Sequence, residues 1–381
     1  MLVDRFLPSD EAYAIVDLAR RVADAELAPR ADDFEARGEF PRDVLRTLGS
    51  VGLLGLPYPV ELGGGGQPYE VYVQVLEELA YRWLTVAEAV SVHTLACHAV
   101  ANFGTDEQRG EFLPGLVAGD RLGAYCLTEP GGGSDAAALT TRARRDGDGF
   151  VVEGTKAFIT HAGVADFYTV FARTGGAGAA GISCFLAEAG EGIAAARGES
   201  KMGLSASPTG QVVFDGARVG AGRLIGGEGA GFSIAMSALD AGRLGIAACA
   251  VGLARSALDF AVEYARRRRQ FGAAVIDFQG VGFLLADASA QVEAARALVV
   301  HAARLRDAGA QGAGVMAARA KLVASDVAMR VATDAVQVLG GYGYVSDFPV
   351  ERWFREAKVL QIVEGTNQIQ RLVIARALAK G

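Results

Sequence analysis

The pattern of apolar residues changes twice along this chain, and the change limits the folds it can adopt. Residues up to about 120 look helical, with 3–4 spacing over 12–28 and an Ala-, Leu- and Val-rich stretch over 71–103. From about 121 to 225, short runs rich in β-branched and aromatic residues alternate with turn sequences. Helical spacing returns after about 230. Helices, strands and helices without βα alternation argue against a Rossmann domain.

The chain is long enough for more than one core. With 381 residues, it exceeds the size at which a single core stops growing. We expect an α+β multidomain protein with an N-terminal α-helical domain over 1–120, a middle antiparallel β domain over 121–229 and a C-terminal helical bundle over 230–381. The expected strands lie at 149–153, 167–171, 181–186 and 211–214. The four expected C-terminal helices lie around 246–264, 281–308, 314–339 and 367–379.

Composition and charge exclude several classes of function. Hydrophobic residues make up 51% and charged residues 21%, as in a soluble globular protein. The net charge of −7 argues against a nucleic-acid surface. The stretch 244–254 is too short to span a bilayer, and residues 1–10 contain no apolar segment of a secretory signal. We expect no nucleic-acid or membrane partner.

The cysteines and histidines give no sign of a disulfide framework or a metal site. The four cysteines are far apart and form no CxxC: Cys97, Cys126, Cys184 and Cys249. Free, mostly buried thiols indicate a reduced, cytoplasmic setting. His93 and His98 are five residues apart, which is poor spacing for one helical face, so we expect no metal. The chain also lacks a P-loop, an HExxH motif and a serine nucleophile elbow.

One carboxylate near the C-terminus has the surroundings of a general base. Glu364 lies in the run Ile362-Val-Glu-Gly-Thr-Asn-Gln368, among apolar residues and directly before a glycine. Burial raises the pKa of a carboxyl group, which suits a base that works near neutral pH. Gly365 allows close approach of the backbone to a ligand. The same string also fits an ordinary helix end.

Two segments of the β region have the composition of half-sites for a flat polar ligand. Residues 124–135 contain three consecutive glycines flanked by Thr128, Ser134 and Asp135, a pattern that fits an anion-binding turn or a plain glycine turn. Residues 156–160 place Phe158 and Thr160 on one strand face. The pair fits a ring and a hydroxyl against a ligand, or a core phenylalanine beside a surface threonine.

Two segments of the C-terminal region also allow two interpretations. Residues 264–272 carry four consecutive arginines, which either complement a helix dipole or bind phosphate. The run Gln337-Val-Leu-Gly-Gly341 fits a glycine C-cap at the end of a helix.

Taken together, these segments resemble the acyl-CoA dehydrogenase family in order, spacing and residue type. The most specific motifs are Leu127-Thr-Glu-Pro-Gly-x-Gly-Ser-Asp135 and the stretch 344–371, which contains Phe348-Pro-Val-Glu-Arg352 and Ile369-Gln-Arg371. The resemblance covers nearly the whole chain. It implies FAD in a cleft between the middle and C-terminal domains, an acyl-CoA substrate and an electron-transferring flavoprotein as partner. It also implies a homodimer at least, and usually a homotetramer.

The resemblance also implies roles for individual residues. Glu364 would be the catalytic base, with Gly365 beside the substrate. Ser134 would lie at the acyl-CoA entrance and also contact the cofactor, and Asp240 and Arg243 would contact the CoA portion. The remaining cofactor contacts would come from Tyr125, Leu127, Thr128, Gly133, Phe158, Ile159, Thr160, Thr366 and Gln368. Contacts to FAD held mainly by a neighbouring subunit would come from Arg268, Gln270, Phe271, Phe278, Gln279, Gln337, Val338, Gly340 and Gly341.

Two positions refine the expected chemistry. Some members of the family carry the base one residue before the arginine that matches Arg243, but this chain has Gly242 there, which leaves Glu364 as the base. Many members have a tyrosine before the base, whereas this chain has Val363, and we expect a short or branched acyl chain. Other interpretations are an acyl-CoA oxidase, a nitroalkane oxidase or flavin hydroxylase, a dehydrogenase of carrier-bound acyl groups, or a non-catalytic acyl-CoA-binding protein.

Overall fold

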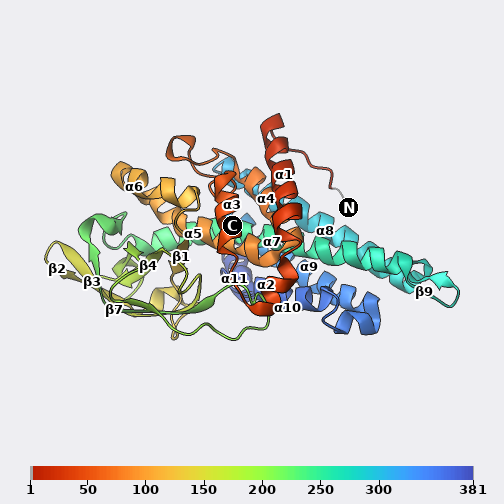
Figure 1. Ribbon diagram of the computed structural model, residues 1–381. Coiled ribbons are helices and arrows are strands. Elements are labelled where there is room, and N and C mark those ends of the chain that lie inside the picture. Colours follow the sequence, from red (N-terminus) through yellow and green to blue (C-terminus); the bar gives the residue numbers. More distant parts are fainter. Residues whose placement is uncertain (1–2, 381) are drawn as a thin grey trace.

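The computed structural model describes residues 3–380, and its N-terminal part is helical (Figure 1). The elements in chain order are α1 (Asp10–Val22), a π-helical turn (Ala23–Leu27), α2 (Ala31–Arg37), α3 (Arg42–Ser50), α4 (Tyr69–Arg82), α5 (Leu84–Phe103) and α6 (Asp106–Val117). The expected helix over 12–28 corresponds to α1 and the turn that continues it. Helix α6 begins with a capping box in which the side chains of Thr105 and Gln108 satisfy each other's backbone N–H groups.

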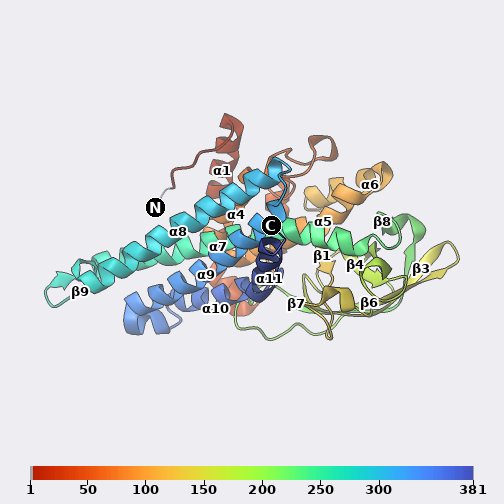
Figure 2. The same cartoon turned by 180° about the vertical axis from the view of Figure 1, so that it is seen from behind.

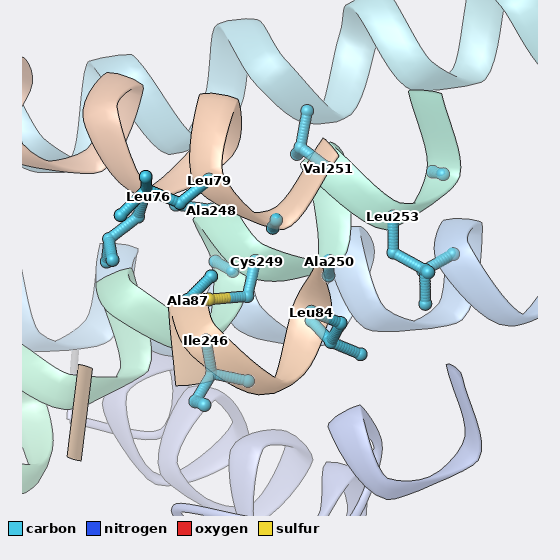
Figure 3. Close-up of a cluster of buried hydrophobic side chains, with 14 of the residues drawn as sticks. Leu76, Leu79, Leu84, Ala87, Ile246, Ala248, Cys249, Ala250, Val251 and Leu253 are labelled. Atoms are coloured by element: carbon cyan, nitrogen blue, oxygen red, sulfur yellow. The ribbon is translucent and has the colours of Figure 1, made fainter. Parts of the chain in front are cut away.

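The apolar stretch 71–103 forms two helices rather than one. Trp83 separates α4 from α5 because its backbone is extended, with φ −157° and ψ 105°. Its buried indole N–H donates to Glu35 Oε1 at 2.9 Å, which fixes the break. Leucines of α4 and α5 then pack around the small residues of α7 (Gly231–Arg267), as Figure 3 shows for Leu76, Leu84 and Ala248.

A mostly antiparallel sheet follows. Its strands are β1 (Gly123–Cys126), β2 (Arg142–Asp146), β3 (Gly149–Thr160), β4 (Phe167–Arg173), β5 (Ile182–Glu188), β6 (Ile193–Ala195), β7 (Thr209–Gly220) and β8 (Leu224–Ile225). Their order is β6-β7-β3-β2-β4-β5-β8, with β1 added beside β4. Three of the four expected strands fall within β3, β4 and β7, and the fourth, 181–186, begins one residue before β5. The parallel pairing of β1 with β4 is a feature that the sequence did not indicate.

The C-terminal part contains three long helices and two shorter ones. After α7 come the two-residue strands β9 (Arg269–Gln270) and β10 (Ala273–Ala274), then α8 (Gln279–Asp307), α9 (Ala313–Leu339), α10 (Val350–Leu360) and α11 (Asn367–Leu378). Helix α10, which the sequence did not lead us to expect, packs against α7 and α9, and α11, the fourth expected helix, packs on α9. In Figures 1 and 2, α7 runs from the sheet to the β9 turn at the opposite end.

In the part of the chain that the structure describes, two helices are long and apolar enough to cross a membrane by length and composition alone. They are α5 and α7, and 94% and 83% of their most apolar windows are buried inside the protein, as in core helices. The apolar part of α7 is longer than the stretch 244–254 that the sequence suggested. Arg243 and Arg255 do not end it, because both are buried: Arg243 pairs with Asp240 on α7 itself, and Arg255 pairs with Glu77 of α4.

Candidate active site

A cavity of about 930 Å³ lies between the sheet and the C-terminal helices. Its walls come from α5, the loop after β1, the end of β3, α7, the segment between α10 and α11, and α11 itself. Twelve of the predicted site residues line it: Tyr125, Leu127, Thr128, Gly133, Ser134, Phe158, Ile159, Thr160, Arg243, Glu364, Gly365 and Thr366. Segments as far apart in the sequence as Glu88 and Arg376 therefore meet around one space.

Glu364 is held in a strained turn between α10 and α11. Its φ is +52°, a left-handed value that is uncommon for a residue other than glycine, and Gly365 follows with φ +90°. Part of the residue faces the cavity, but both carboxylate oxygens are buried and have no hydrogen-bond partner among residues 3–380. Burial raises the pKa of this carboxyl group to about 8, against the opposing charges of Lys321 and Arg243. The group therefore has the environment of a base rather than of an ion pair.

Gly242 provides the space that the carboxylate occupies. A Cβ atom at this position on α7 would lie 2.1 Å from Glu364 Oε2 and 2.7 Å from its Cδ. Distances this short exclude any side chain at position 242 while Glu364 keeps its place. The glycine found in the sequence is thus a packing requirement of the Glu364 carboxylate.

An internal ion pair shapes the glycine-rich loop that follows β1. Glu129 accepts from Lys156 Nζ at 2.8 Å, and both side chains are buried. The same carboxylate accepts from the backbone N–H groups of Thr140 and Thr141. Burial raises the pKa of Glu129, but Lys156 outweighs this effect and lowers it to about 2. The ionised pair ties the loop to β3, with Thr128 and Ser134 on the cavity wall.

Phe158 and Thr160 line the same wall. The regular register of β3 is interrupted between Lys156 and Ile159, and Phe158 adopts a φ of +55°. The residue remains 68% exposed although its side chain is large and apolar. A strained, uncovered ring at the edge of a cavity provides a face on which a flat ligand can stack.

The residues expected to reach a neighbouring subunit lie outside the main cavity. Arg268, Gln270, Val338, Gly340 and Gly341 surround a second cavity of about 630 Å³. The guanidinium of Arg268 lies 5.6 Å from the centre of the Tyr342 ring. Phe271, Phe278, Gln279 and Gln337 are exposed in the same region. Figure 1 places the β9 turn at the end of the helices that is far from the sheet.

Two further predicted residues are not on the wall of the main cavity. Asp240 lines a separate cavity of about 440 Å³ with Ser237 and Arg306, although its carboxylate pairs with Arg243 at 2.5 Å. Gln368 is exposed on the first turn of α11. Thr366 caps α11 by accepting from Ile369 N–H. Gln368, two residues further on, points to another side of the helix than Thr366 does.

Sequence reasoning missed a second carboxyl group on the cavity wall. Glu88 of α5 accepts from Thr160 Oγ1 and from Ser207 Oγ, each at 3.2 Å. Burial raises the pKa of Glu88 to about 7, and these two bonds oppose the rise. Its signal in the sequence was a single acidic residue in the apolar run 84–101. The apolar wall contributed by Leu372 and Val373 of α11 was also missed.

His93 and His98 have structural partners, and the cysteines form no disulfide. His93 bonds to Leu116 O and accepts from Gly123 N–H, while His98 bonds to Ser237 Oγ. No group of three or more metal-binding side chains occurs among the described residues. All four cysteines are buried and free, as the sequence predicted.

The arrangement of helices, sheet and cavity can be compared with known proteins. Family models match residues 9–120 as an acyl-CoA dehydrogenase N-terminal domain, 124–217 as the middle domain and 229–379 as the C-terminal domain. An acyl-CoA dehydrogenase of Bacillus subtilis is 44% identical over 376 residues, which is 98% of this chain and 99% of the relative. The chain belongs to the acyl-CoA dehydrogenase family. This confirms the resemblance and the three-part architecture that the sequence predicted.

Solved structures of similar proteins share the whole fold. Butyryl-CoA dehydrogenase from Megasphaera elsdenii is 42% identical, with a TM-score of 0.96 over 99% of this chain and 100% of its own. A chain from the structure described as "Electron transferring flavoprotein of Acidaminococcus fermentans: Towards a mechanism of flavin-based electron bifurcation" is 41% identical. Its TM-score is 0.97 over 99% of this chain and 100% of its own. The protein is therefore an oxidoreductase, and its family uses FAD.

The residues on the cavity wall fit a flavin. The exposed Phe158 ring offers a stacking face, and the hydroxyls of Thr128, Ser134 and Thr160 offer polar contacts beside it. The unpartnered carboxylate of Glu364 lines the same space, where a substrate bound against the flavin would meet it. The contacts of individual residues to the cofactor stay predictions.

Proposed function

We propose that this protein catalyses the α,β-dehydrogenation of an acyl-CoA thioester to the trans-2-enoyl-CoA, with Glu364 as the base that removes the α-proton. The observation that carries the proposal is the buried, unpartnered carboxylate on the wall of the flavin-type cavity. Burial raises its pKa to about 8, so its ionised form is a stronger base than an ordinary carboxylate. Bound FAD supplies the acceptor for the β-hydride.

The backbone around Glu364 supports this chemistry. The α-proton of a thioester is too weakly acidic for a free carboxylate, so the site must stabilise the developing negative charge on the thioester oxygen. The backbone N–H of Glu364 has no acceptor among the described residues and is available for this oxygen. A preorganised donor of this kind contributes about 3–4 kcal/mol to stabilisation of the transition state. The apolar walls exclude water and strengthen the bond.

The proposed cofactor contacts come from two groups of residues, one on the wall of the main cavity and one around the second cavity near the β9 turn. Phe158 would stack on the flavin ring, Thr160 would bond near its N5 atom, and the loop 125–134 would contact its polar edge. Arg268 and Gln270, with the 337–341 segment, would bind the cofactor of a neighbouring subunit. Ser134 and Arg243 would contact the substrate, and Asp240 would reach its CoA portion from the adjoining cavity.

Replacing the base tests the proposal directly. Glu364→Gln keeps the shape of the side chain but removes its basicity. We therefore expect normal binding of FAD and acyl-CoA, with turnover reduced by about 10³-fold or more. The measurement is the rate at which acyl-CoA bleaches the flavin absorbance without oxygen. A turnover near that of the wild type would refute the assignment.

The substrate is proposed to be a short or branched acyl-CoA. Val363, directly before the base, is smaller than the tyrosine found in many members of the family, and the similarity to butyryl-CoA dehydrogenase supports a short chain. A panel of straight-chain substrates from butyryl- to palmitoyl-CoA, together with isobutyryl- and 2-methylbutyryl-CoA, should give the highest kcat/KM for the short or branched members. An optimum at lauroyl-CoA or longer would contradict this assignment.

We further propose that the electrons leave to an electron-transferring flavoprotein, that the protein is a homotetramer and that it works in the cytoplasm. The similarity to a chain from the structure described as an electron-transferring flavoprotein supports the first point. The exposed aromatic residues at the far end of α7–α9 support assembly with further subunits. The four free, buried cysteines suit a reducing compartment.

The alternatives make different predictions. An acyl-CoA oxidase of the same fold would consume oxygen during turnover, whereas a dehydrogenase would reduce an added dye. A nitroalkane oxidase, a flavin hydroxylase or an enzyme of carrier-bound acyl groups would leave the flavin oxidised when acyl-CoA is added. A non-catalytic binding protein would bind acyl-CoA without bleaching the flavin.

A further inference from the structure

A buried lysine bonds to the turn that carries Glu364. Lys321 of α9 is completely buried, although lysine is among the side chains least often found inside proteins. Its Nζ donates to the carbonyl oxygen of Gly365 at 3.0 Å and to Asn367 Oδ1 at 2.9 Å. It pairs with no carboxylate among the described residues at ion-pair distance. The first bond holds the backbone directly after the proposed base, and the second holds Asn367, the first residue of α11.

The turn itself needs such support. Glu364 and Gly365 are consecutive residues with positive φ, and the strain persists only if the surroundings hold the turn in place. Gln370 Nε2 donates to the carbonyl oxygens of both residues, at 3.2 and 2.8 Å. Asn367 in turn donates to Ser325 Oγ and to Asp326 Oδ1. Within residues 3–380, Lys321 is the cation that bonds to the turn itself, while Arg371 reaches the network only at its edge, through Asp326 Oδ2.

We propose that Lys321 is a positioning residue for the base: its buried ammonium holds the turn that aims the Glu364 carboxylate into the cavity, and it places a positive charge beneath that carboxylate. The inference rests on the proposed function, because it assigns a role relative to Glu364 as the base. Nothing in it depends on which acyl-CoA is the substrate.

The charges around Glu364 come from three helices. Lys321 on α9 and Arg243 on α7 favour the ionised carboxylate, and Glu88 on α5 opposes it. Burial lowers the pKa of Lys321 to about 8, while the nearby Glu364 opposes the fall. Lys321 therefore carries its charge at neutral pH. Its removal should raise the pKa of Glu364, because one of the two cations that favour the carboxylate is lost.

A neutral side chain at position 321 should still allow folding. Lys321→Met keeps the length of the side chain. The two acceptors that lose the ammonium each retain a second donor: Gln370 donates to the Gly365 carbonyl, and Ser325 donates to Asn367 Oδ1. Replacing a buried charge with an apolar group of similar size is often neutral or stabilising. We therefore expect a Tm and an FAD content close to those of the wild type.

The test compares Lys321→Met and Lys321→Gln with the wild type and with Lys358→Met, the same substitution at an exposed lysine of α10. The dependence of kcat/KM on pH reports ionisation in the free enzyme. We expect both neutral variants to move the acidic limb upward by roughly one pH unit. In Lys321→Met, kcat on the high-pH plateau should also fall about tenfold, since the turn loses a donor. Lys358→Met should change neither quantity.

Hydrogen exchange gives a measurement that needs no turnover. The backbone amides of 361–367 should exchange faster in Lys321→Met than in the wild type, with the rest of the chain unchanged. An unmoved acidic limb in both neutral variants would overturn the inference, as would unchanged exchange of this segment. An active Glu364→Gln enzyme would instead refute the proposed function, so the two failures are distinguishable.

Discussion

At the scale of single residues, the site depends on a glycine as much as on a carboxylate. Glu364 is aimed by its own left-handed backbone toward α7, and Gly242 leaves the space that its carboxylate fills. A side chain at position 242 and the observed placement of the Glu364 carboxylate therefore exclude each other, because the first would displace the second. The absence of a carboxylate at position 242 and the presence of one at 364 have one physical cause.

Gly242→Ala should therefore damage catalysis more than stability. The added Cβ would lie 2.1 Å from Glu364 Oε2 and push the carboxylate out of position. A displacement of about 1 Å at a reacting group costs roughly 10² in rate, so we expect kcat to fall about 100-fold. The matched control is Gly110→Ala in α6, where an added Cβ meets nothing within 4 Å. Steady-state kinetics check both variants, and equal kcat values would contradict the steric explanation.

At the scale of elements, a buried cluster of charges joins the N-terminal helices to the C-terminal bundle. Glu77 of α4 pairs with Arg5, with Arg255 of α7 and with Arg296 of α8, at 2.9–3.1 Å. Burial raises the pKa of Glu77, but the three arginines outweigh it and lower the pKa to about 2. The ionised carboxylate thus connects three helices at one point.

Glu77→Gln should destabilise the fold strongly, because it removes one of the carboxylates that balance three buried arginines. Glu78 remains for Arg5 and Arg255. Glu293 remains for Arg296, so one positive charge loses its compensation. The expected loss is about 3–5 kcal/mol in the free energy of unfolding, measured by denaturant titration. The control is Asp17→Asn in the exposed pair with Arg21, for which we expect about 0.5 kcal/mol or less.

The pH dependence of the same cluster has a definite sign. The folded pKa of Glu77 lies below the ordinary value of 4.5. Its contribution is therefore fully present above pH 4.5 and is lost as pH falls toward 2. The difference in stability between wild type and Glu77→Gln should shrink over that range, and a constant difference would contradict the ion-pair explanation.

At the scale of the whole molecule, the predicted cofactor contacts form two groups that one chain does not bring together. The first lines the main cavity beside the sheet, and the second surrounds the cavity near the β9 turn at the other end of α7 (Figure 2). If FAD binds at the first, the second must serve another copy of the chain. A complete site would then contain residues of two subunits.

Mixed oligomers can test this arrangement. Arg268→Ala and Glu364→Gln should each be poorly active alone. Co-expressed with different tags and purified as a hybrid, they should regain about half of the wild-type activity, because one site then holds both Glu364 and a neighbour's Arg268. A hybrid no more active than its parents would show that each chain completes its own site.

Much of the fold was predictable from the sequence because it follows from local patterns. Helical spacing predicted α8, α9 and α11 to within about two residues, and β-branched runs between turns located four strands. The break at Trp83 was not predictable, because it depends on a bond from the indole to Glu35, 48 residues away. The parallel strand β1 was missed for the same reason, since its partner β4 lies about 40 residues further on.

The sequence by itself determined the order of helices and strands, the family and the identity of the proposed base, because these depend on residue types at fixed spacings. Only the tertiary structure decided what surrounds Glu364: the space left by Gly242, the buried ammonium of Lys321 and the second carboxyl of Glu88. These groups come from α7, α9 and α5, far from one another along the chain. Their effect on the base depends on distance and burial, which arise only when the helices pack.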